Sequence, residues 1–248
     1  MSSEARDRNR DAWNAERYDS WVKAIGTPEA EAKHLVANPR HVPRRLLPHL
    51  GDVAGKTICS VQGSHGRVAV ALTLLGAEVT VIDFSEENRR YALELAQAAR
   101  VSIDYRVGDS LEADKLGLTF DAVVMELGIL HYHRDIARFF EVMRAITRPG
   151  GTMLINEFHP VQRKLFGTLE PRDYFNTALT EGDVPNPTGD GRTLGKCTLR
   201  FWTLGEIVTA VIGAGFRVER LDEHPDWTDA KIPGTFTLVA RVPSGETS

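Results

Sequence analysis

Between residues 56 and 159, segments with the hydrophobic pattern of a strand alternate with segments that have the hydrophobic pattern of a helix. Short apolar runs typical of buried strands occupy residues 56–61, 78–83, 101–109, 120–126 and 152–158. Segments with helical spacing separate them at residues 66–76, 86–99 and 135–146. Strands that alternate with helices at this spacing predict a parallel sheet covered by helices on both faces.

The pattern changes on either side of this region. Residues 4–24 predict one helix with Trp13, Tyr18 and Trp21 near a single face, and Thr27 is suited to cap a second helix. A helix at 203–215 is followed by strands at 216–225 and 234–242. Only a short loop joins these two strands, which predicts an antiparallel pair at the sheet edge.

Residues 160–197 interrupt the alternation with many prolines and glycines, as a lid or binding loop does. The fold class predicted is therefore α/β, with a doubly wound, mostly parallel seven-stranded sheet and a C-terminal antiparallel strand pair. We expect one compact domain made of an N-terminal helical lid (1–50), a core (51–159 and 198–244) and a substrate cap inserted after the fifth strand (160–197).

Composition narrows the function classes. The 248 residues are 42% apolar and 26% charged, with a net charge of −4, which argues against a nucleic-acid surface. Cys59 and Cys197 make no disulfide framework, and no zinc-type spacing is present, so no metal is expected. The polar N-terminus lacks a signal core, and no run of about 18 apolar residues predicts a membrane span. We expect a soluble, cytoplasmic monomer or homodimer.

The loop after the first strand, "SVQGSHG", resembles half of a nucleotide-binding fingerprint. Gly63 and Gly66 permit a tight turn before a helix N-terminus that favours an anion, but Gln62 and Ser64 stand where the usual pattern has glycine. Asp83 lies 23 positions after Ser60 (83 − 60), near the spacing of an acidic residue that binds ribose hydroxyls. The alternatives are an adenosine-type ligand or a close-packed turn without a ligand.

Two observations favour S-adenosylmethionine over NAD. A pyrophosphate needs several bare amides, and side chains at Gln62 and Ser64 crowd it, whereas a methionine carboxylate needs fewer. The C-terminal half also lacks a second mononucleotide-binding repeat.

The chain resembles the class I S-adenosylmethionine-dependent methyltransferases. The resemblance rests on "KTICSVQGSHGRVAVALTLLGAEVTVIDFSEEN", "VGDSLE", "FDAVVMELGILHYHRD" and "ITRPGGTMLINEFHP", which occur in the family's order, and on "AWNAERYDSWV" at the front. It covers residues 10–160 well and 198–243 in outline. Ser60 stands at the family's first-strand acidic position, and with Gln62 and Ser64 it implies altered packing around the methionine part.

The resemblance implies roles for cofactor-site residues. Ser60 and the backbone of Gln62, Gly63 and Ser64 would line the methionine part, Asp83 would bind the ribose, and Phe84 would flank the adenine. Asp109 and Ser110 would receive the adenine amino group, and Tyr18 would close over the cofactor. The competing interpretations are a helix-capping carboxylate for Asp83, a loop carboxylate for Asp109, and an N-terminal helix that is merely docked.

Candidate acceptor-site residues follow the fourth and fifth strands. Glu126 could stabilise the positive charge of the cofactor's sulfonium or orient an amine of the acceptor. Alternatively, it makes only a structural hydrogen bond. His131 and His159 are candidate general bases, since imidazole titrates near neutrality, although a loop histidine bonded to backbone competes with that role. Further candidates for substrate binding are Trp21, His133, Glu157, Arg172, Tyr174 and Phe175.

The function expected is methyl transfer by in-line displacement to a nitrogen or oxygen of a small molecule such as a secondary metabolite, with S-adenosylhomocysteine (SAH) as product. Holding the reacting atoms about 3–3.5 Å apart supplies much of the acceleration, so a base is needed only for a protonated nucleophile. The alternatives are a non-catalytic relative that has lost the cofactor and an NAD(P)-dependent oxidoreductase. A short-chain-type oxidoreductase would need a Tyr-x-x-x-Lys pair after the fourth strand, and this sequence has none there.

Overall fold

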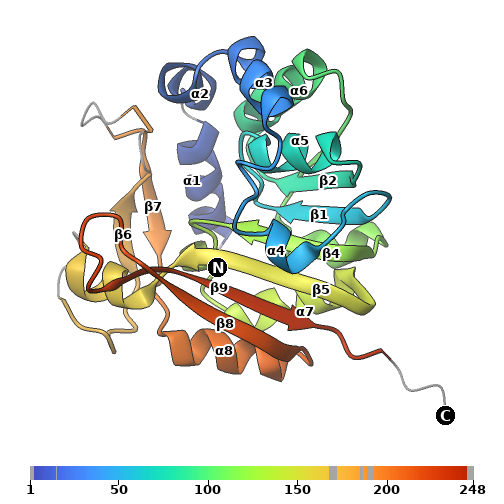
Figure 1. The fold of residues 1–248 in the computed structure, drawn as a ribbon. Coiled ribbons are helices and arrows are strands. Elements are labelled where there is room, and N and C mark those ends of the chain that lie inside the picture. The colour runs from blue at the N-terminus through green and yellow to red at the C-terminus, as the bar shows by residue number, and fades with distance from the viewer. Residues whose placement is uncertain (1–2, 15, 168–171, 185–186, 189–192, 245–248) are drawn as a thin grey trace. The chain divides into compact units, whose positions relative to one another are not determined.

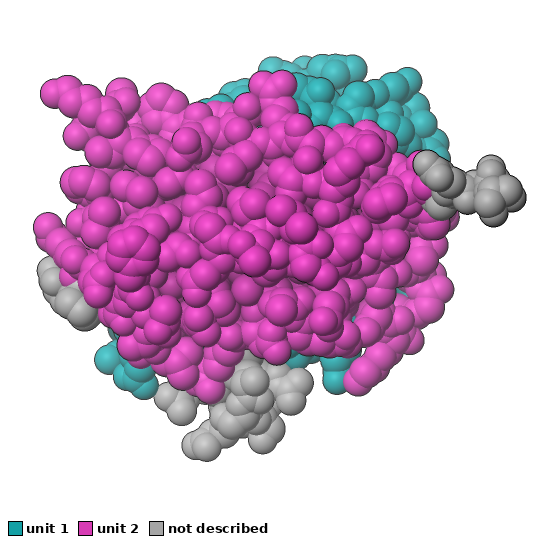
Figure 2. Space-filling model, turned by 90° about the horizontal axis from the view of Figure 1, so that it is seen from below, with its two compact units in different colours: residues 1–113, 181–198 teal, residues 114–180, 199–248 magenta. Residues whose placement is uncertain are grey.

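The structure is a computed structural model of the 248-residue chain, and it describes residues 3–14, 16–167, 172–184, 187–188 and 193–244. The chain forms two compact units, which Figure 2 colours separately. The first unit contains residues 1–113 and 181–198, and the second contains residues 114–180 and 199–248. The functional division into lid, core and cap stays a prediction.

The first unit is built from helices at the N-terminus and a strand–helix alternation (Figure 1). Its elements are α1 (Ser3–Asn14), α2 (Arg17–Ile25), α3 (Pro28–Ala37), α4 (Leu47–Leu50), β1 (Thr57–Val61), α5 (Arg67–Leu74), β2 (Glu78–Asp83), α6 (Glu86–Ala98) and β3 (Asp104–Val107). Strands β1, β2 and β3 pair in parallel, and their side chains are buried on β1 and β2. Helices α1, α2 and α3 pack on α6.

The second unit carries the other four strands of the large sheet, the helices α7 and α8 and two short helical segments. Its elements are β4 (Phe120–Glu126), η2 (Leu130–Tyr132), α7 (Ile136–Ile146), β5 (Thr147–Phe158), η3 (Gln162–Phe166), α8 (Leu204–Gly213), β8 (Arg217–Pro225) and β9 (Pro233–Arg241). Strand β4 is parallel to β5, whereas β9 is antiparallel to both β5 and β8. Helices α7 and α8 pack against each other, and Phe139, Phe140 and Phe236 are fully buried in this core.

The sheet order is β3-β2-β1-β4-β5-β9-β8. The parallel pairs β1–β2, β2–β3 and β4–β5, with the antiparallel pair β8–β9 at the C-terminus, confirm the predicted fold class. The predicted cap at Thr27 is also confirmed, because its side chain accepts a hydrogen bond from the Ala30 amide. Ser85 caps α6 in the same way, through the Asn88 amide.

The single helix expected over residues 4–24 is wrong. Helix α1 ends at Asn14, and α2 begins at Arg17 after Glu16, whose φ is 48°. The Asn14 side-chain oxygen accepts hydrogen bonds from the Ser85 hydroxyl and the Glu87 amide at the start of α6. A short polar side chain that bonds elsewhere competes with helix continuation, which explains the break.

Residues 148–151 ("RPGG"), between the predicted helix at 135–146 and the predicted strand at 152–158, lie inside strand β5. Phe120 pairs with Thr147 and Ala122 with Thr152, so the four residues 148–151 of β5 lie opposite the single residue 121 of β4. Gly150 has φ +75°, and its amide bonds to the Val242 carbonyl. The turn chemistry is therefore present, but backbone pairing with the end of the chain keeps the segment in the strand.

Residues 160–197 contain more regular structure than predicted. Besides the π-helical η3, they include strands β6 (Thr180–Asp183) and β7 (Lys196–Leu199), which pair in a separate two-stranded sheet. η1 (Ser110–Leu116) is a further short helix that was not expected.

Candidate cofactor and acceptor sites

The loop after β1 keeps a glycine-type backbone despite its substitutions. Gln62 and Ser64 have φ values of 51° and 49°, and Gly66 has 76°. Gly63 is required by space, since a Cβ there would lie 2.7 Å from the Ser60 hydroxyl and 2.9 Å from a Val81 methyl. The left-handed conformation costs a side-chain-bearing residue about 1–2 kcal/mol, so the loop stores strain at the two positions where the sequence lacks glycine.

This strain predicts opposite effects for two small substitutions. Ser64→Gly should raise the free energy of unfolding by about 0.5–1 kcal/mol, because relief of strain exceeds the added chain entropy of glycine. Gly63→Ala should lower it by about 1–3 kcal/mol through overpacking. Urea unfolding of both variants checks the pair, and a destabilised Ser64→Gly protein would contradict the strain argument.

Asp83 ends β2 and is 4% exposed. Its Oδ1 accepts hydrogen bonds from the Ser85 amide (2.9 Å) and the Asn88 side chain (3.4 Å), and its Oδ2 accepts one from the Ser64 amide (3.0 Å). Burial raises the pKa of this carboxyl, and these hydrogen bonds and Arg17 partly oppose the shift. Asp83 therefore joins the β1 loop to the start of α6. Its hydrogen bond from the Ser85 amide agrees with the competing interpretation of Asp83 as a helix-capping carboxylate.

The other predicted cofactor residues of this unit lie around the same loop. The Gln62 side chain donates to the Ser110 hydroxyl (3.1 Å), and Ser60 and Ser110 are buried. Asp109 is half-buried and accepts a hydrogen bond from the Leu111 amide (2.9 Å), as a loop carboxylate does. Phe84 is half-buried. The cofactor roles of all these residues stay predictions.

Helix α2 places two predicted aromatic residues on α6. The Tyr18 hydroxyl donates to the Glu94 carboxylate, which raises the pKa of Tyr18 to about 12. Trp21 Nε1 donates to Asn88 Oδ1 (2.8 Å), so α2 is tied to the residue that also contacts Asp83.

Two residues missed by sequence analysis lie beside Trp21. The His65 ring centroid is 4.3 Å from the Trp21 ring, and Arg17 is fully buried with its guanidinium 5.5 Å from that ring. Burial lowers the pKa of His65 to about 3, so the imidazole is neutral. His65 Nδ1 and Ser64 Oγ are buried and have no hydrogen-bond partner among the described residues.

In the second unit, Glu157 organises the loop after β4. Its Oε1 accepts hydrogen bonds from the Gly128 and Phe158 amides (both 2.7 Å). Its Oε2 accepts from the Ile129 and Leu130 amides (2.6 and 3.1 Å). Four backbone donors converge on one carboxylate that is 3% exposed, so this side chain positions the loop.

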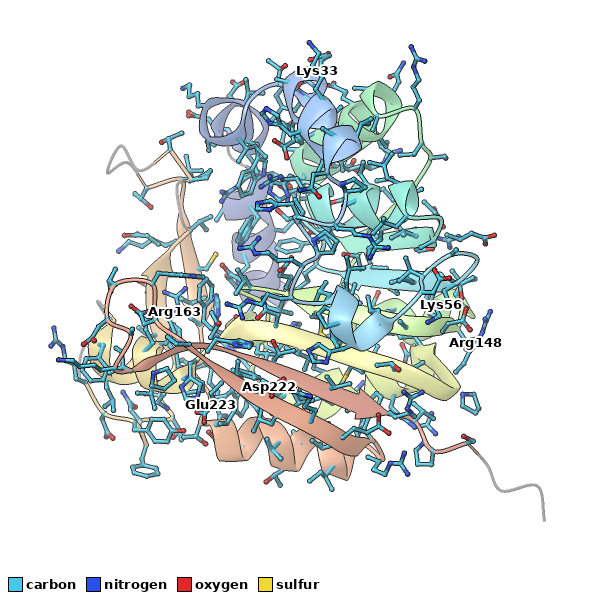
Figure 3. The ribbon with its side chains drawn as sticks, in the orientation of Figure 1. Lys33, Lys56, Arg148, Arg163, Asp222 and Glu223 are labelled. Carbon is cyan, nitrogen blue, oxygen red and sulfur yellow. The ribbon has the colours of Figure 1, made fainter. Side chains whose placement is uncertain are left out.

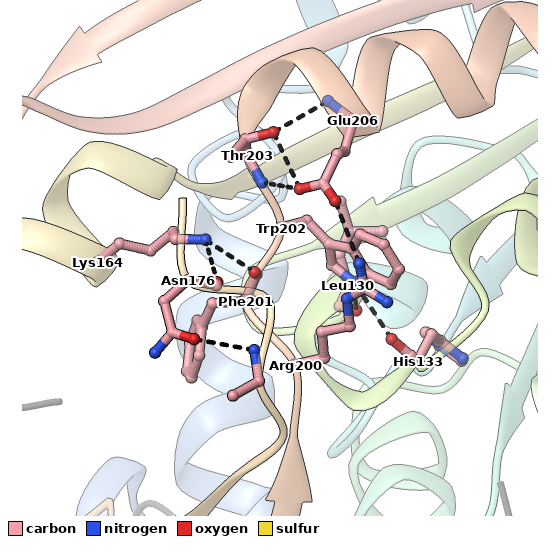
Figure 4. A network of polar contacts seen from close by, with 10 residues as sticks. Leu130, His133, Lys164, Asn176, Arg200, Phe201, Trp202, Thr203 and Glu206 are labelled. Carbon is pink, nitrogen blue, oxygen red and sulfur yellow. Dashed lines mark hydrogen bonds and ion pairs between the residues drawn. The ribbon is translucent and has the colours of Figure 1, made fainter. Parts of the chain in front are cut away.

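A small pocket lies beside this loop, with about 20 Å³ of water-accessible volume. Its walls are mostly apolar and are formed by Leu130, His131, Glu157, Phe158, Pro160, Arg163, Phe201, Trp202 and Ile207. Trp202 Nε1 donates to the carbonyls of Leu130 and His133, which fixes one wall (Figure 4). The structure thus brings predicted His131 and Glu157 together in one pocket.

The remaining acceptor-site candidates lie in other surroundings. Glu126 accepts a hydrogen bond from the Asn156 side chain (3.3 Å), and buried His133 stacks on Phe139. His159 is buried, with Nδ1 accepting from the Val161 amide and Nε2 lying 2.8 Å from Glu223 Oε1.

In the 160–197 insertion, the Tyr174 hydroxyl accepts from the Leu204 amide (3.1 Å) at the start of α8. Arg172 and Phe175 are exposed. Lys164 is buried and donates to the carbonyls of Asn176 and Phe201, which joins η3 to this segment (Figure 4). The acceptor-site roles of Tyr174, Arg172 and Phe175 stay predictions.

Buried neutral histidines make the stability depend on pH. Burial lowers the pKa values of His65 and His131 from 6.5 to about 3. Between these values the unfolded chain binds protons that the folded chain does not, so the free energy of unfolding falls as the pH falls. From pH 7.5 to 5.5 each histidine should remove about 1.4 kcal/mol, or about 3 kcal/mol together.

Urea unfolding at the two pH values measures this loss, and His65→Gln and His131→Gln should each remove about half of it. Asp83, with its raised pKa, acts in the opposite direction, but it is common to all three proteins and cancels in the comparison. Equal pH dependence in wild type and both variants would contradict the argument.

Within the described residues, no group of three or more His, Cys, Asp or Glu side chains is arranged to hold a metal ion. No helix in the described part of the chain is long and apolar enough to cross a membrane.

Sequence reasoning missed Arg163 and Trp202. Trp202 carried a usable signal, since "RFWT" precedes a capped helix. Arg163 carried none, because one arginine in a polar stretch is indistinguishable from a solvated one.

Comparison with known proteins finds a family match for the segment that runs from β1 into β5. Residues 58–151 match the family model described as a methyltransferase domain. The chain is 34% identical over 114 residues to a ubiquinone biosynthesis O-methyltransferase of Methylocella silvestris, covering 46% of this chain and 41% of the relative. It is 30% identical over 170 residues to a demethylmenaquinone methyltransferase of Deinococcus radiodurans, covering 66% and 65%. The chain thus matches less than two thirds of the length of these relatives.

Among solved structures, the fold is similar to magnesium protoporphyrin IX methyltransferase from Synechocystis PCC 6803 with bound SAH. The TM-score is 0.60 at 18% identity, covering 94% of this chain and 97% of that one. The family match identifies residues 58–151 as a methyltransferase domain, and both named relatives of the chain are methyltransferases.

Proposed function

We propose that the protein transfers a methyl group from S-adenosylmethionine to an oxygen or nitrogen nucleophile of a small molecule. The observation that carries the proposal is the loop after β1. Gln62 and Ser64 adopt a left-handed backbone conformation on either side of Gly63, and the Ser64 amide donates to Asp83. Strain of this kind persists at ligand-binding sites, where the backbone shape is itself the functional feature.

The residues present fit an adenosyl ligand. A carboxylate offers about four lone-pair sites, and three protein donors bind the Asp83 carboxylate, which leaves capacity for a ribose hydroxyl. Ser64 Oγ and His65 Nδ1 are buried polar atoms of the same loop without partners among the described residues, and a ligand could satisfy them. Ser110, held by Gln62, would lie toward the adenine.

The cofactor, when bound, supplies a methyl group already activated by the sulfonium. The chain then has to bind the cofactor and the acceptor, orient them for transfer and exclude water. Asp83 would hold the ribose, and the β1 loop would hold the methionine part. Trp21 and Tyr18, fixed by Asn88 and Glu94, would keep α2 against α6 in the same unit.

The acceptor is proposed to be a small molecule whose polar end enters the pocket beside Leu130 and Phe158. The Methylocella relative is named an O-methyltransferase, which favours oxygen as the nucleophile. The net charge of −4 gives no support to a nucleic-acid acceptor.

The two histidines proposed as general bases receive little support from their surroundings. Burial lowers the pKa of His131 to about 3, which makes it a poor proton acceptor near neutrality. Burial also lowers the pKa of His159, whose Nδ1 already accepts a backbone hydrogen bond. We therefore expect an acceptor that arrives already deprotonated.

A non-catalytic binding protein is the second candidate. This alternative is supported by the three protein donors that already bind the Asp83 carboxylate, and by the Gln62 side chain, which already donates to the Ser110 hydroxyl. An NAD(P)-dependent oxidoreductase has less support, because the second half of the sheet ends in an antiparallel pair.

Incubation of the protein with methyl-labelled S-adenosylmethionine and a panel of phenols, carboxylic acids and amines tests the proposal. We expect label transfer to at least one class and equimolar SAH. SAH binding without label transfer to any class would favour the binding protein and contradict the enzyme.

A further inference from the structure

The pocket of the second unit contains one cation among apolar walls. Arg163 extends from η3, and its Cζ lies 3.8 Å from the centroid of the Phe158 ring (Figure 3). Its Nε is buried and has no hydrogen-bond partner among the described residues. Burial lowers the pKa of this guanidinium, although it remains charged in any accessible pH range.

The carboxylate of Glu157, whose charge acts on Arg163, does not neutralise it. Both Glu157 oxygens are occupied by backbone amides of residues 128–130 and 158. Glu157 attracts the guanidinium over a distance, but no ion pair to Arg163 forms among the described residues. The charge of Arg163 therefore lacks a hydrogen-bonded counter-ion.

The other polar wall residue cannot replace a counter-ion. His131 is neutral, because burial and the Arg163 charge lower its pKa to about 3, and its ring stacks on Phe201 with centroids 5.5 Å apart. A partly buried cation without a partner is costly, and an anion from the ligand would offset that cost. The planar guanidinium fork matches a carboxylate with two parallel hydrogen bonds.

The size of the pocket limits what enters it. A volume of about 20 Å³ accessible to water accommodates the oxygens of a carboxylate but not a whole ring. Phe158, Phe201 and Trp202 supply flat apolar surfaces at the same place. A ligand that suits both features has a carboxylate attached to a flat apolar frame.

Resting on the proposed function, we propose that Arg163 selects acceptors that carry a carboxylate on a flat apolar frame, with the carboxylate paired to the guanidinium in the pocket. Arg163 is then a specificity-determining residue, and an acceptor without the anion binds poorly.

The test compares three probes of similar shape and different charge. Benzoate, benzamide and benzylamine are titrated into the full chain by calorimetry and by Trp fluorescence, with and without saturating SAH. We expect binding of benzoate at least about tenfold tighter than of benzamide, the contribution expected from hydrogen bonds to a charged group. Benzylamine should not bind measurably.

Variants assign the effect to Arg163. Arg163→Gln should weaken benzoate binding about 10- to 100-fold and leave benzamide binding within about twofold. Arg163→Lys keeps the charge but loses the paired donors of the guanidinium, so its affinity for benzoate should lie between those of wild type and Arg163→Gln. Arg220→Gln removes one positive charge from an exposed ion pair with Asp222 in the same unit and should change nothing. Melting temperatures establish that each variant is folded.

Three results would overturn the inference: no benzoate binding to wild type, equal binding of benzamide and benzoate, or unchanged benzoate binding in Arg163→Gln. The SAH titration is a separate readout that Arg163→Gln should leave unchanged. Absence of SAH binding would remove the methyltransferase proposal, whereas a benzoate effect seen without SAH would still stand as a property of the pocket.

Discussion

Replacing Asp83 with alanine is expected to abolish SAH binding and to destabilise the first unit. The carboxylate holds the Ser64 and Ser85 amides and the Asn88 side chain, and it lies near the fully buried Arg17, whose charge favours its ionised form. Removal leaves three buried donors without their acceptor and takes away a negative charge that acts on Arg17, which should cost about 2–4 kcal/mol of unfolding free energy. Loss of the ribose contact should weaken SAH binding more than about 100-fold.

Two further variants separate binding from folding. Asp83→Asn keeps the shape and one oxygen acceptor, so it should stay folded and bind SAH more than about tenfold more weakly. Asp104→Ala removes an exposed carboxylate of β3 in the same unit and should leave both properties unchanged. Calorimetry and thermal unfolding report the two effects, and wild-type SAH affinity in Asp83→Ala would refute the assigned role.

Replacing Glu157 with alanine is expected to lower the melting temperature by about 10 °C. The substitution leaves the amides of residues 128–130 and 158 without their acceptor, at a cost of about 3–5 kcal/mol. Loop residue Leu130 also receives the Trp202 hydrogen bond, so the Trp fluorescence spectrum should shift as the pocket loosens.

Glu157→Gln keeps one carbonyl oxygen and should lose about half as much stability. Glu141→Ala removes an exposed carboxylate of α7 in the same unit and serves as the matched control. If Glu157→Ala is no less stable than Glu141→Ala, the loop does not depend on this carboxylate.

The strands and caps were predictable from the sequence because local rules act directly on them. The apolar runs at 58–61 and 120–126 and the caps Thr27 and Ser85 obey burial periodicity and side-chain capping, which need only neighbouring residues. The break at Glu16 was not predictable, since its cause is the contact of Asn14 with Ser85, 71 residues away.

The candidate sites were predictable in part for the same reason. Strand-end positions such as Asp83 and Glu157 follow from the α/β pattern, but the donors that occupy their oxygens come from other loops and are invisible to spacing. The φ values of Gln62 and Ser64 are the sharpest case. The sequence indicated lost glycines, whereas the folded loop keeps their backbone conformation.

Calorimetric titration of the wild-type chain with SAH and NAD in parallel tests the central claim most directly. We expect micromolar SAH binding at one site and no detectable NAD binding. Absence of SAH binding, or NAD binding of equal strength, would contradict the methyltransferase assignment of the β1 loop.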